Sequence, residues 1–158
     1  MPLQFDADVA VAHLKKRDRD LGAIIREAGP FTLKPPRGVS PFEALLRAIV
    51  SQQLSGKAAA TIFGRVKTLY PGRNGLQPAA ILETADDVLR QAGMSRAKVA
   101  SVKDLAAKTL DGTVPSLAKL RRLDDAEIVE RLVSVRGIGV WTVEMLLMFR
   151  LGRPDVLP

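Results

Sequence analysis

Helix start and stop signals recur along most of the chain, and they constrain its fold more than any other feature. In Ser40-Pro41-Phe42-Glu43, serine can cap a helix, proline suits the first helical position and glutamate the third. The apolar residues that follow repeat with the spacing of one helical face, and Gln53 falls on the same stripe. This stripe comprises Phe42, Leu45, Leu46, Ile49 and Val50. The pattern predicts a helix from Ser40 to about Gln53.

Similar signals predict further helices. The candidate N-caps are Ser55, Thr84, Ser95 and Asp124. Apolar spacing before Gly29 predicts helices near the N-terminus as well. No segment alternates apolar and polar residues for five positions in the manner of a β-strand. The sequence therefore predicts an all-α, multi-helix bundle of about eight short helices with short connections.

Composition narrows the function classes. The chain carries 24 Lys and Arg against 17 Asp and Glu, a net charge of +7, so a polyanion is the first partner to consider. Cysteine is absent, which excludes disulfides and thiolate-bound metals, and the single histidine argues against a His-rich metal site. No apolar run has the roughly 18 residues of a membrane span, and no signal peptide is recognisable. We expect a cytoplasmic, nucleoid-associated protein with no membrane partner.

The turn Val135-Arg136-Gly137-Ile138-Gly139 joins two predicted helices. Glycine permits positive φ and lets another backbone or a ligand approach closely. The N-terminus of the next helix presents free amides and the positive end of its dipole, which suits an anion. The turn therefore predicts phosphate contacts through the amides at Gly137 and Gly139, which would bind a nucleic acid without reading bases. The alternative is an ordinary helical hairpin whose glycines only cap a helix and permit close crossing.

Four segments together resemble one known superfamily. "LVSVRGIGVWTVEMLLMF" (residues 132–149) resembles the helix-hairpin-helix of DNA glycosylases. "PFEALLRAIVSQQLSGKAAATI" (residues 41–62) resembles the early helix and wedge loop of 3-methyladenine DNA glycosylases of the AlkA type. "GMSRAKVASVKDLA" (residues 93–106) resembles their connecting segment, and "FRLGRPDVLP" (residues 149–158) the run into their catalytic loop. The matches follow in order over nearly the whole chain.

The resemblance implies base-excision repair. Such an enzyme flips an alkylated base out of duplex DNA and hydrolyses its N-glycosidic bond. On the matching positions, Gln53 with Gln52 beside it would fill the space left by the base. Independently of the family, an uncompensated amide on an apolar stripe would be costly if buried, which favours a projecting position. The alternative for the glutamines is a solvated pair at a helix end.

The resemblance also assigns residues of the hairpin. Arg136, Gly137 and Gly139 would bind the DNA backbone. Trp141 would line the base pocket, where its ring suits an electron-poor alkylated purine. Met145 stands one turn later, where relatives often have a second aromatic residue. The alternative for Trp141 is plain core packing.

The hairpin implies a monofunctional glycosylase, without lyase activity through the residue at position 141. Bifunctional relatives carry a Schiff-base lysine at the position of Trp141, and tryptophan cannot form that adduct. The family hairpin commonly binds a monovalent cation through main-chain carbonyls, which here match Val133, Val135 and Ile138. The resemblance thus implies K⁺ or Na⁺ at the hairpin and requires no other cofactor.

The resemblance places the catalytic carboxylate beyond Pro158. In the family it is an aspartate just beyond a "DVLP"-like run, so the expected Asp lies just past Pro158. Glu144 and Asp155 are the carboxylates near the hairpin, and neither is assigned to catalysis. The chain is therefore interpreted as ending before its catalytic loop, and the stretch alone is not expected to be active.

The sequence is interpreted as one helical glycosylase-like domain, residues 1–158. Residues 1–39 would form N-terminal helices of one lobe, residues 40–150 a central lobe with the hairpin at 124–150, and residues 151–158 the start of the catalytic loop. We expect a monomer that binds double-stranded DNA with alkylated bases. The rival hypotheses are a non-catalytic helix-hairpin-helix DNA-binding module and a helical interaction protein.

Overall fold

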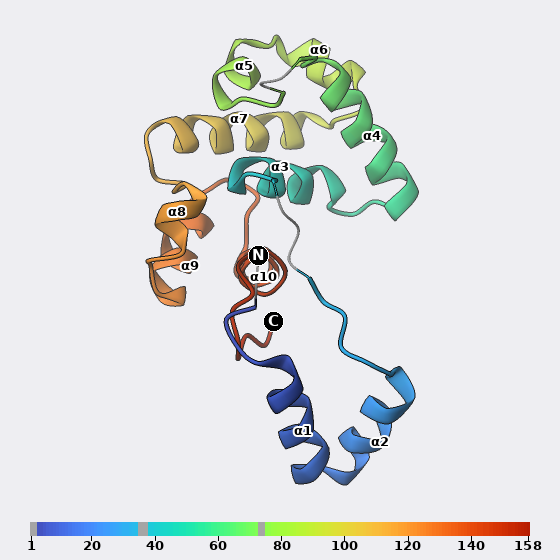
Figure 1. Cartoon of the computed structure of the whole chain (residues 1–158). Coiled ribbons are helices and arrows are strands. Elements are labelled where there is room, and N and C mark those ends of the chain that lie inside the picture. Colours follow the sequence, from blue (N-terminus) through green and yellow to red (C-terminus); the bar gives the residue numbers. More distant parts are fainter. Residues whose placement is uncertain (1–2, 35–37, 73–74) are drawn as a thin grey trace. The chain divides into compact units, whose positions relative to one another are not determined.

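The structure is a computed structural model that describes residues 3–34, 38–72 and 75–158 (Figure 1). Within these ranges the chain forms ten α-helices and one π-helical turn, without a strand, so the predicted all-α class is confirmed. The elements are α1 (Ala7–Arg17), α2 (Arg19–Ala28), α3 (Pro41–Ser51), α4 (Gly56–Thr68), α5 (Pro78–Glu83), α6 (Asp86–Gln91), α7 (Arg96–Leu110), α8 (Leu117–Leu120), α9 (Asp125–Val133), α10 (Val140–Leu146) and the π-helical turn η1 (Leu147–Leu151). Among the described residues, no helix is both long and apolar enough to cross a membrane.

The chain divides into two compact units. Residues 39–143 form the larger unit, and residues 1–38 together with 144–158 form the smaller one. The boundary therefore passes through α10, whose first residues belong to the larger unit.

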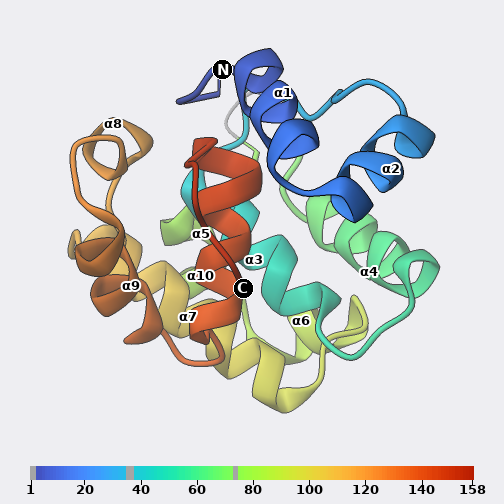
Figure 2. The ribbon, with the colours of Figure 1, turned by 90° about the horizontal axis from the view of Figure 1, so that it is seen from below.

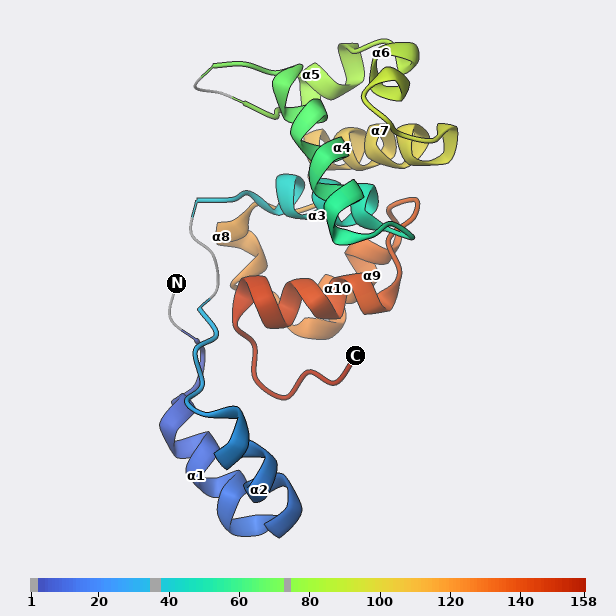
Figure 3. The same cartoon turned by 90° about the vertical axis from the view of Figure 1, so that its right-hand side faces the viewer.

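In the larger unit, α7 lies between α5 and α3, and α3 also packs against α4 (Figures 1 and 3). The predicted apolar stripe of α3 forms much of this core, because all five of its apolar residues are buried. The predicted caps explain why the helices begin where they do. The side chains of Ser40, Ser55, Ser95 and Asp124 each accept a hydrogen bond from the backbone amide three residues later.

The structure corrects the prediction for the end of α3. The helix ends at Ser51, and Gln53 has φ of 57°, so Gln53 does not continue the helical stripe. The last turn tightens, since the amide of Gln52 donates to the carbonyl of Ile49 (3.4 Å) and that of Leu54 to the carbonyl of Ser51 (3.2 Å). These bonds turn the chain before a further helical residue can be added.

Two short helices, α5 and α8, were not predicted from the sequence. With six and four residues they are too short for an apolar face to repeat. Thr84 was expected to cap the following helix. Instead its hydroxyl donates to the carbonyl of Ala80 (2.7 Å), and Ala85 is the N-cap residue of α6.

In the smaller unit, α1 and α2 form a helical hairpin (Figure 3). Asp18 ends α1 and caps α2, where its carboxylate accepts a hydrogen bond from the amide of Leu21. Gly22 is buried where the helices approach, and a Cβ there would lie 3.0 Å from the carbonyl oxygen of Lys15. The chain entering α1 is bound to the end of η1, because the amide of Gln4 donates to the carbonyl of Gly152 (3.0 Å).

Candidate nucleic-acid interface

A glycine-containing turn joins α9 to α10 (Figure 2). It is a β-turn with two apolar anchors, Val135 and Ile138. The amide of Ile138 donates to the carbonyl of Val135 (3.0 Å), and Gly137 has φ of 79°, as the third residue of a type II turn requires. Val135 and Ile138 are buried, whereas Arg136, Gly137 and Gly139 are exposed. The turn is thus held by its apolar residues and presents its glycines to solvent.

The start of α10 leaves backbone amides free. The carbonyl of Gly139 accepts hydrogen bonds from the amides of Thr142 (3.0 Å) and Val143 (3.2 Å), so Gly139 begins the helix. Within the described part of the chain, the amides of Gly139, Val140 and Trp141 donate no hydrogen bond. First-turn amides point outward along the helix axis and carry the positive end of its dipole. An anion can be bound there without side-chain participation.

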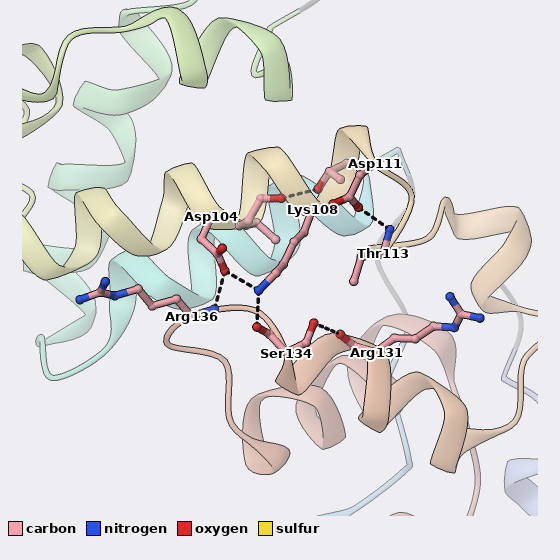
Figure 4. A network of polar contacts seen from close by, with 9 residues as sticks. Asp104, Lys108, Asp111, Thr113, Arg131, Ser134 and Arg136 are labelled. Atoms are coloured by element: carbon pink, nitrogen blue, oxygen red, sulfur yellow. Dashed lines mark hydrogen bonds and ion pairs between the residues drawn. The ribbon is translucent and has the colours of Figure 1, made fainter.

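A carboxylate and an ammonium of α7 fix the shape of the turn (Figure 4). The Oδ2 atom of Asp104 accepts hydrogen bonds from the backbone amide of Arg136 (2.7 Å) and from the Nζ atom of Lys108 (3.0 Å). Lys108 also donates to the carbonyl of Ser134. The Arg136 side chain extends away from this network, so its guanidinium is available to a ligand.

A glycine is required at position 137 for a second reason besides its φ. A Cβ built there would lie 2.8 Å from the Oγ atom of Ser101, a buried residue of α7. At Gly139, by contrast, a Cβ would meet nothing within 4 Å. The two glycines therefore differ: a side chain at position 137 would point against α7, whereas one at position 139 would point into open space.

The ionisation of Asp104 is coupled to the fold. Burial raises the pKa of this carboxyl, but the hydrogen bond from the Arg136 amide, with the hydrogen bond and charge of Lys108, outweighs burial and lowers the pKa. A carboxylate whose pKa is lowered by folding stabilises the folded state above its unfolded pKa. That contribution is lost as the pH falls through the lowered folded value.

We expect Asp104→Asn to lower the free energy of unfolding by about 1–2 kcal/mol at pH 7, because asparagine keeps an acceptor for Arg136 but loses the charge that Lys108 neutralises. The difference from the wild type should begin to shrink near pH 4, where an unfolded aspartate becomes protonated, and should vanish once the pH falls below the lowered folded pKa. Urea unfolding of both proteins from pH 7 to pH 3 measures it. A constant difference over this range would contradict the coupling.

The predicted wedge loop lies against the hairpin turn. The side-chain amide of Gln52 donates to the carbonyl of Gly137 at 2.7 Å, although 85 residues separate them. Gln52 is half-buried, and Gln53 beside it is exposed. The structure therefore brings the two predicted DNA-binding segments together, with the Gln52 side chain engaged in the protein and the Gln53 side chain open to solvent.

Trp141, in the first turn of α10, is 64% exposed. Core packing, the alternative for this residue, is thus contradicted. Together with Val140, which precedes it and is 50% exposed, Trp141 leaves apolar surface beside the free backbone amides of the helix start. Met145, also in α10, is half-buried.

Of the three carbonyls predicted to bind a monovalent cation, the structure describes the partner of one, that of Val135. The carbonyls of Ser134 and Gly137 accept hydrogen bonds from Lys108 and Gln52, and neither was a predicted ligand. The carbonyl of Val135 accepts one bond from the Ile138 amide, which leaves it a second lone pair. Neutral carbonyl oxygens are the ligands that K⁺ takes in proteins.

Several residues that shape this interface were not predicted from the sequence: Lys98, Ser101, Asp104 and Lys108, all on α7. Residues 93–106, which contain three of the four, resemble a segment of the family, but no local pattern indicates a role for these side chains. Of the carboxylates near the hairpin, Glu144 is half-buried and Asp155 is exposed with φ of 56°. Neither is assigned to catalysis.

Comparison with known proteins agrees with this geometry. Residues 46–158 match the family model of the HhH-GPD superfamily base excision DNA repair protein. The chain is 38% identical over 152 residues to DNA-3-methyladenine glycosylase 1 of Schizosaccharomyces pombe, covering 94% of this chain and 66% of that protein. It is 31% identical over 150 residues to the alkylbase DNA glycosidase-like protein mag2 of the same organism, covering 70% of it.

Solved structures agree as well. The S. pombe 3-methyladenine DNA glycosylase in complex with abasic DNA matches with a TM-score of 0.84 over 94% of this chain and 73% of that chain, at 38% identity. A DNA-3-methyladenine glycosidase from Bacillus halodurans matches with a TM-score of 0.82 over 98% of this chain and 70% of that chain, at 36% identity. The chain therefore belongs to the HhH-GPD superfamily of base-excision DNA repair proteins. It spans about two thirds of the first relative's length.

Proposed function

We propose that the chain is the greater part of a monofunctional DNA glycosylase that removes alkylated bases of the 3-methyladenine type from duplex DNA. The observation that carries this proposal is the exposure of Trp141 directly after a turn with free helix amides. The names of the relatives support it, since two of them are a 3-methyladenine glycosylase and an alkylbase glycosidase-like protein.

Each part of the interface has a role in this proposal. The amides at the start of α10 and the side chain of Arg136 bind the DNA backbone without reading sequence. Gln53 enters the stack and replaces the flipped base, and Trp141 stacks on that base. Met145 contributes to the same pocket with its polarizable thioether.

Hydrolysis needs a carboxylate near the sugar, where positive charge develops as the N-glycosidic bond breaks. We propose that an aspartate following the "DVLP" run supplies it. Tryptophan has no amine to form a Schiff base, so the reaction at this hairpin ends with the free base and an abasic site.

We further propose that the carbonyls of Val133, Val135 and Ile138 bind a monovalent cation, K⁺ or Na⁺. Such a cation would add positive charge at the turn, where a phosphate is expected. The protein would act as a monomer on DNA in the cytoplasm, associated with the nucleoid.

Gly139→Ala tests the phosphate contact. We expect duplex affinity to fall about fivefold to tenfold, because the added methyl group would stand between the helix start and the DNA backbone, at the cost of about one hydrogen bond. Stability should be unchanged, since the Cβ meets nothing within 4 Å. Fluorescence anisotropy over a series of salt concentrations measures affinity and salt slope. Unchanged affinity with an unchanged slope would contradict the contact.

Release of free 3-methyladenine from methylated duplex DNA tests the activity. The protein made from the complete reading frame should release the base, and replacement of the aspartate after the "DVLP" run should abolish release but leave binding. Duplex binding without any base release would instead support the non-catalytic DNA-binding module. Absence of salt-dependent duplex binding would support the helical interaction protein.

A further inference from the structure

The ammonium group of Lys98 caps the C-terminal end of α3. Lys98, from the first turn of α7, donates from its Nζ atom to the carbonyls of Val50 (2.7 Å) and Gln52 (2.8 Å). Helix ends leave carbonyls without intrahelical partners, and a cation is favoured there by the helix dipole. Lys98 is half-buried, and this burial lowers its pKa. Within the described residues it donates to carbonyls alone.

The next residue has a backbone conformation that needs support. Gln53 has φ of 57°, and Asp155 is the other described non-glycine residue with positive φ. The left-handed backbone conformation is unfavourable for residues with a Cβ. A residue keeps this conformation only where the surrounding structure enforces it. Such residues concentrate at functional sites.

The residue that precedes Gln53 is held by two contacts, one to its backbone and one from its side chain. Its carbonyl oxygen, that of Gln52, accepts the bond from Lys98, and the side chain of Gln52 donates to the carbonyl of Gly137. The first contact binds the loop to α7, and the second binds it to the hairpin turn. Both contacts are made by Gln52, the residue directly before the exposed Gln53, so the loop is attached to α7 and to the hairpin turn at this point.

We infer that Lys98 and Gln52 are positioning residues that keep Gln53 ready to enter the DNA stack, and that they join the wedge loop and the phosphate-binding turn into one rigid element. This inference rests on the proposed function and extends it. Neither residue needs to touch the flipped base. A loop ordered before binding loses less conformational entropy when DNA is bound, so the preference for DNA with an open base position increases.

Lys98→Met tests the inference, because methionine keeps most of the apolar stem and removes the ammonium. Lys103→Met is the matched control: Lys103 is on the same helix, pairs with Asp86, and its replacement removes the same charge. Hydrogen exchange of the amides from 52 to 55 should accelerate about tenfold in Lys98→Met and remain unchanged in Lys103→Met. Gln52→Ala, which removes only an amide, should accelerate exchange in the same loop and provides a second variant if Lys98→Met does not fold.

The DNA measurement compares two duplexes, one undamaged and one with a tetrahydrofuran abasic analogue. The preference for the abasic duplex should fall about fivefold to tenfold in Lys98→Met, with affinity for the undamaged duplex within about twofold of wild type. The preference should also fall in Gln52→Ala. Lys103→Met loses the same charge as Lys98→Met, so it controls for the general electrostatic attraction to DNA. It should keep the preference, because the ammonium of Lys103 pairs with Asp86 and not with the loop. Equal loss of affinity for both duplexes would overturn the inference, because Lys98 would then be a phosphate contact.

The two measurements separate the inference from the proposed function. Unchanged exchange in the loop of both Lys98→Met and Gln52→Ala would overturn the positioning role, whatever the DNA result. A wild-type protein without preference for the abasic duplex would contradict the proposed function, whereas the exchange rates would still decide whether Lys98 and Gln52 fix the loop.

Discussion

Replacement of Trp141 by alanine is expected to weaken recognition of an alkylated base about 5- to 150-fold while the fold stays intact. Stacking of a base on an aromatic ring is worth about 1–3 kcal/mol, which corresponds to this range. The side chain is 64% exposed, so its removal uncovers little core. Exposed positions of this kind change stability by about 0.5 kcal/mol or less.

Competition between methylated and undamaged duplexes measures this selectivity, and thermal unfolding measures the stability. Trp141→Phe should retain part of the selectivity, since a smaller ring still stacks. Val140→Ala is the matched control, because Val140 is the preceding residue, is 50% exposed and has no ring. Equal losses on both duplexes would show that Trp141 binds the backbone and not the base.

Gly137→Ala should have the largest effect on stability, about 2–4 kcal/mol of unfolding free energy. One part of this cost is the left-handed backbone, with φ of 79°. The other part is steric, because the new Cβ would lie 2.8 Å from the Oγ atom of Ser101, which is itself buried. Urea unfolding measures the sum.

The steric part can be separated by a double mutant. Ser101→Ala removes the closest atom, so Gly137→Ala should cost less in that background than in the wild type. The backbone cost should remain. Gly139→Ala, where a Cβ meets open space, should leave stability unchanged. If Gly137→Ala proved as mild as Gly139→Ala, the packing of the turn against α7 would be refuted.

The fold could be predicted where its determinants are local. Caps such as Ser40 and Asp124 act on amides three residues away, so they are visible in a short stretch of sequence. The five-residue apolar stripe of α3 is likewise read from one helix. The prediction missed α5 and α8, because helices this short are fixed by packing rather than by periodicity. It also misplaced Gln53, because the end of α3 depends on a lysine from another helix.

The site likewise combines features that local sequence motifs predict with contacts that they do not. The family prediction from the hairpin and wedge-loop motifs is confirmed, and Trp141 stands exposed in the first turn of its helix. The roles predicted for Gln53, Arg136 and the glycines remain predictions for DNA-binding experiments. The supporting contacts of Lys98, Asp104 and Lys108 join positions 26 to 48 residues apart, and no spacing rule in the sequence indicates them.

The hydrogen bonds that α7 makes to the turn bear on whether the hairpin is a transferable module. The residues that define the motif lie on α9, the turn and α10, but the acceptor for the Arg136 amide and the donor to the Ser134 carbonyl lie on α7. A graft of residues 125–146 onto another helical scaffold would carry the motif without the groups that give it its shape. The shape of this turn therefore depends on three helices, and the helix-hairpin-helix motif itself lies on only two of them.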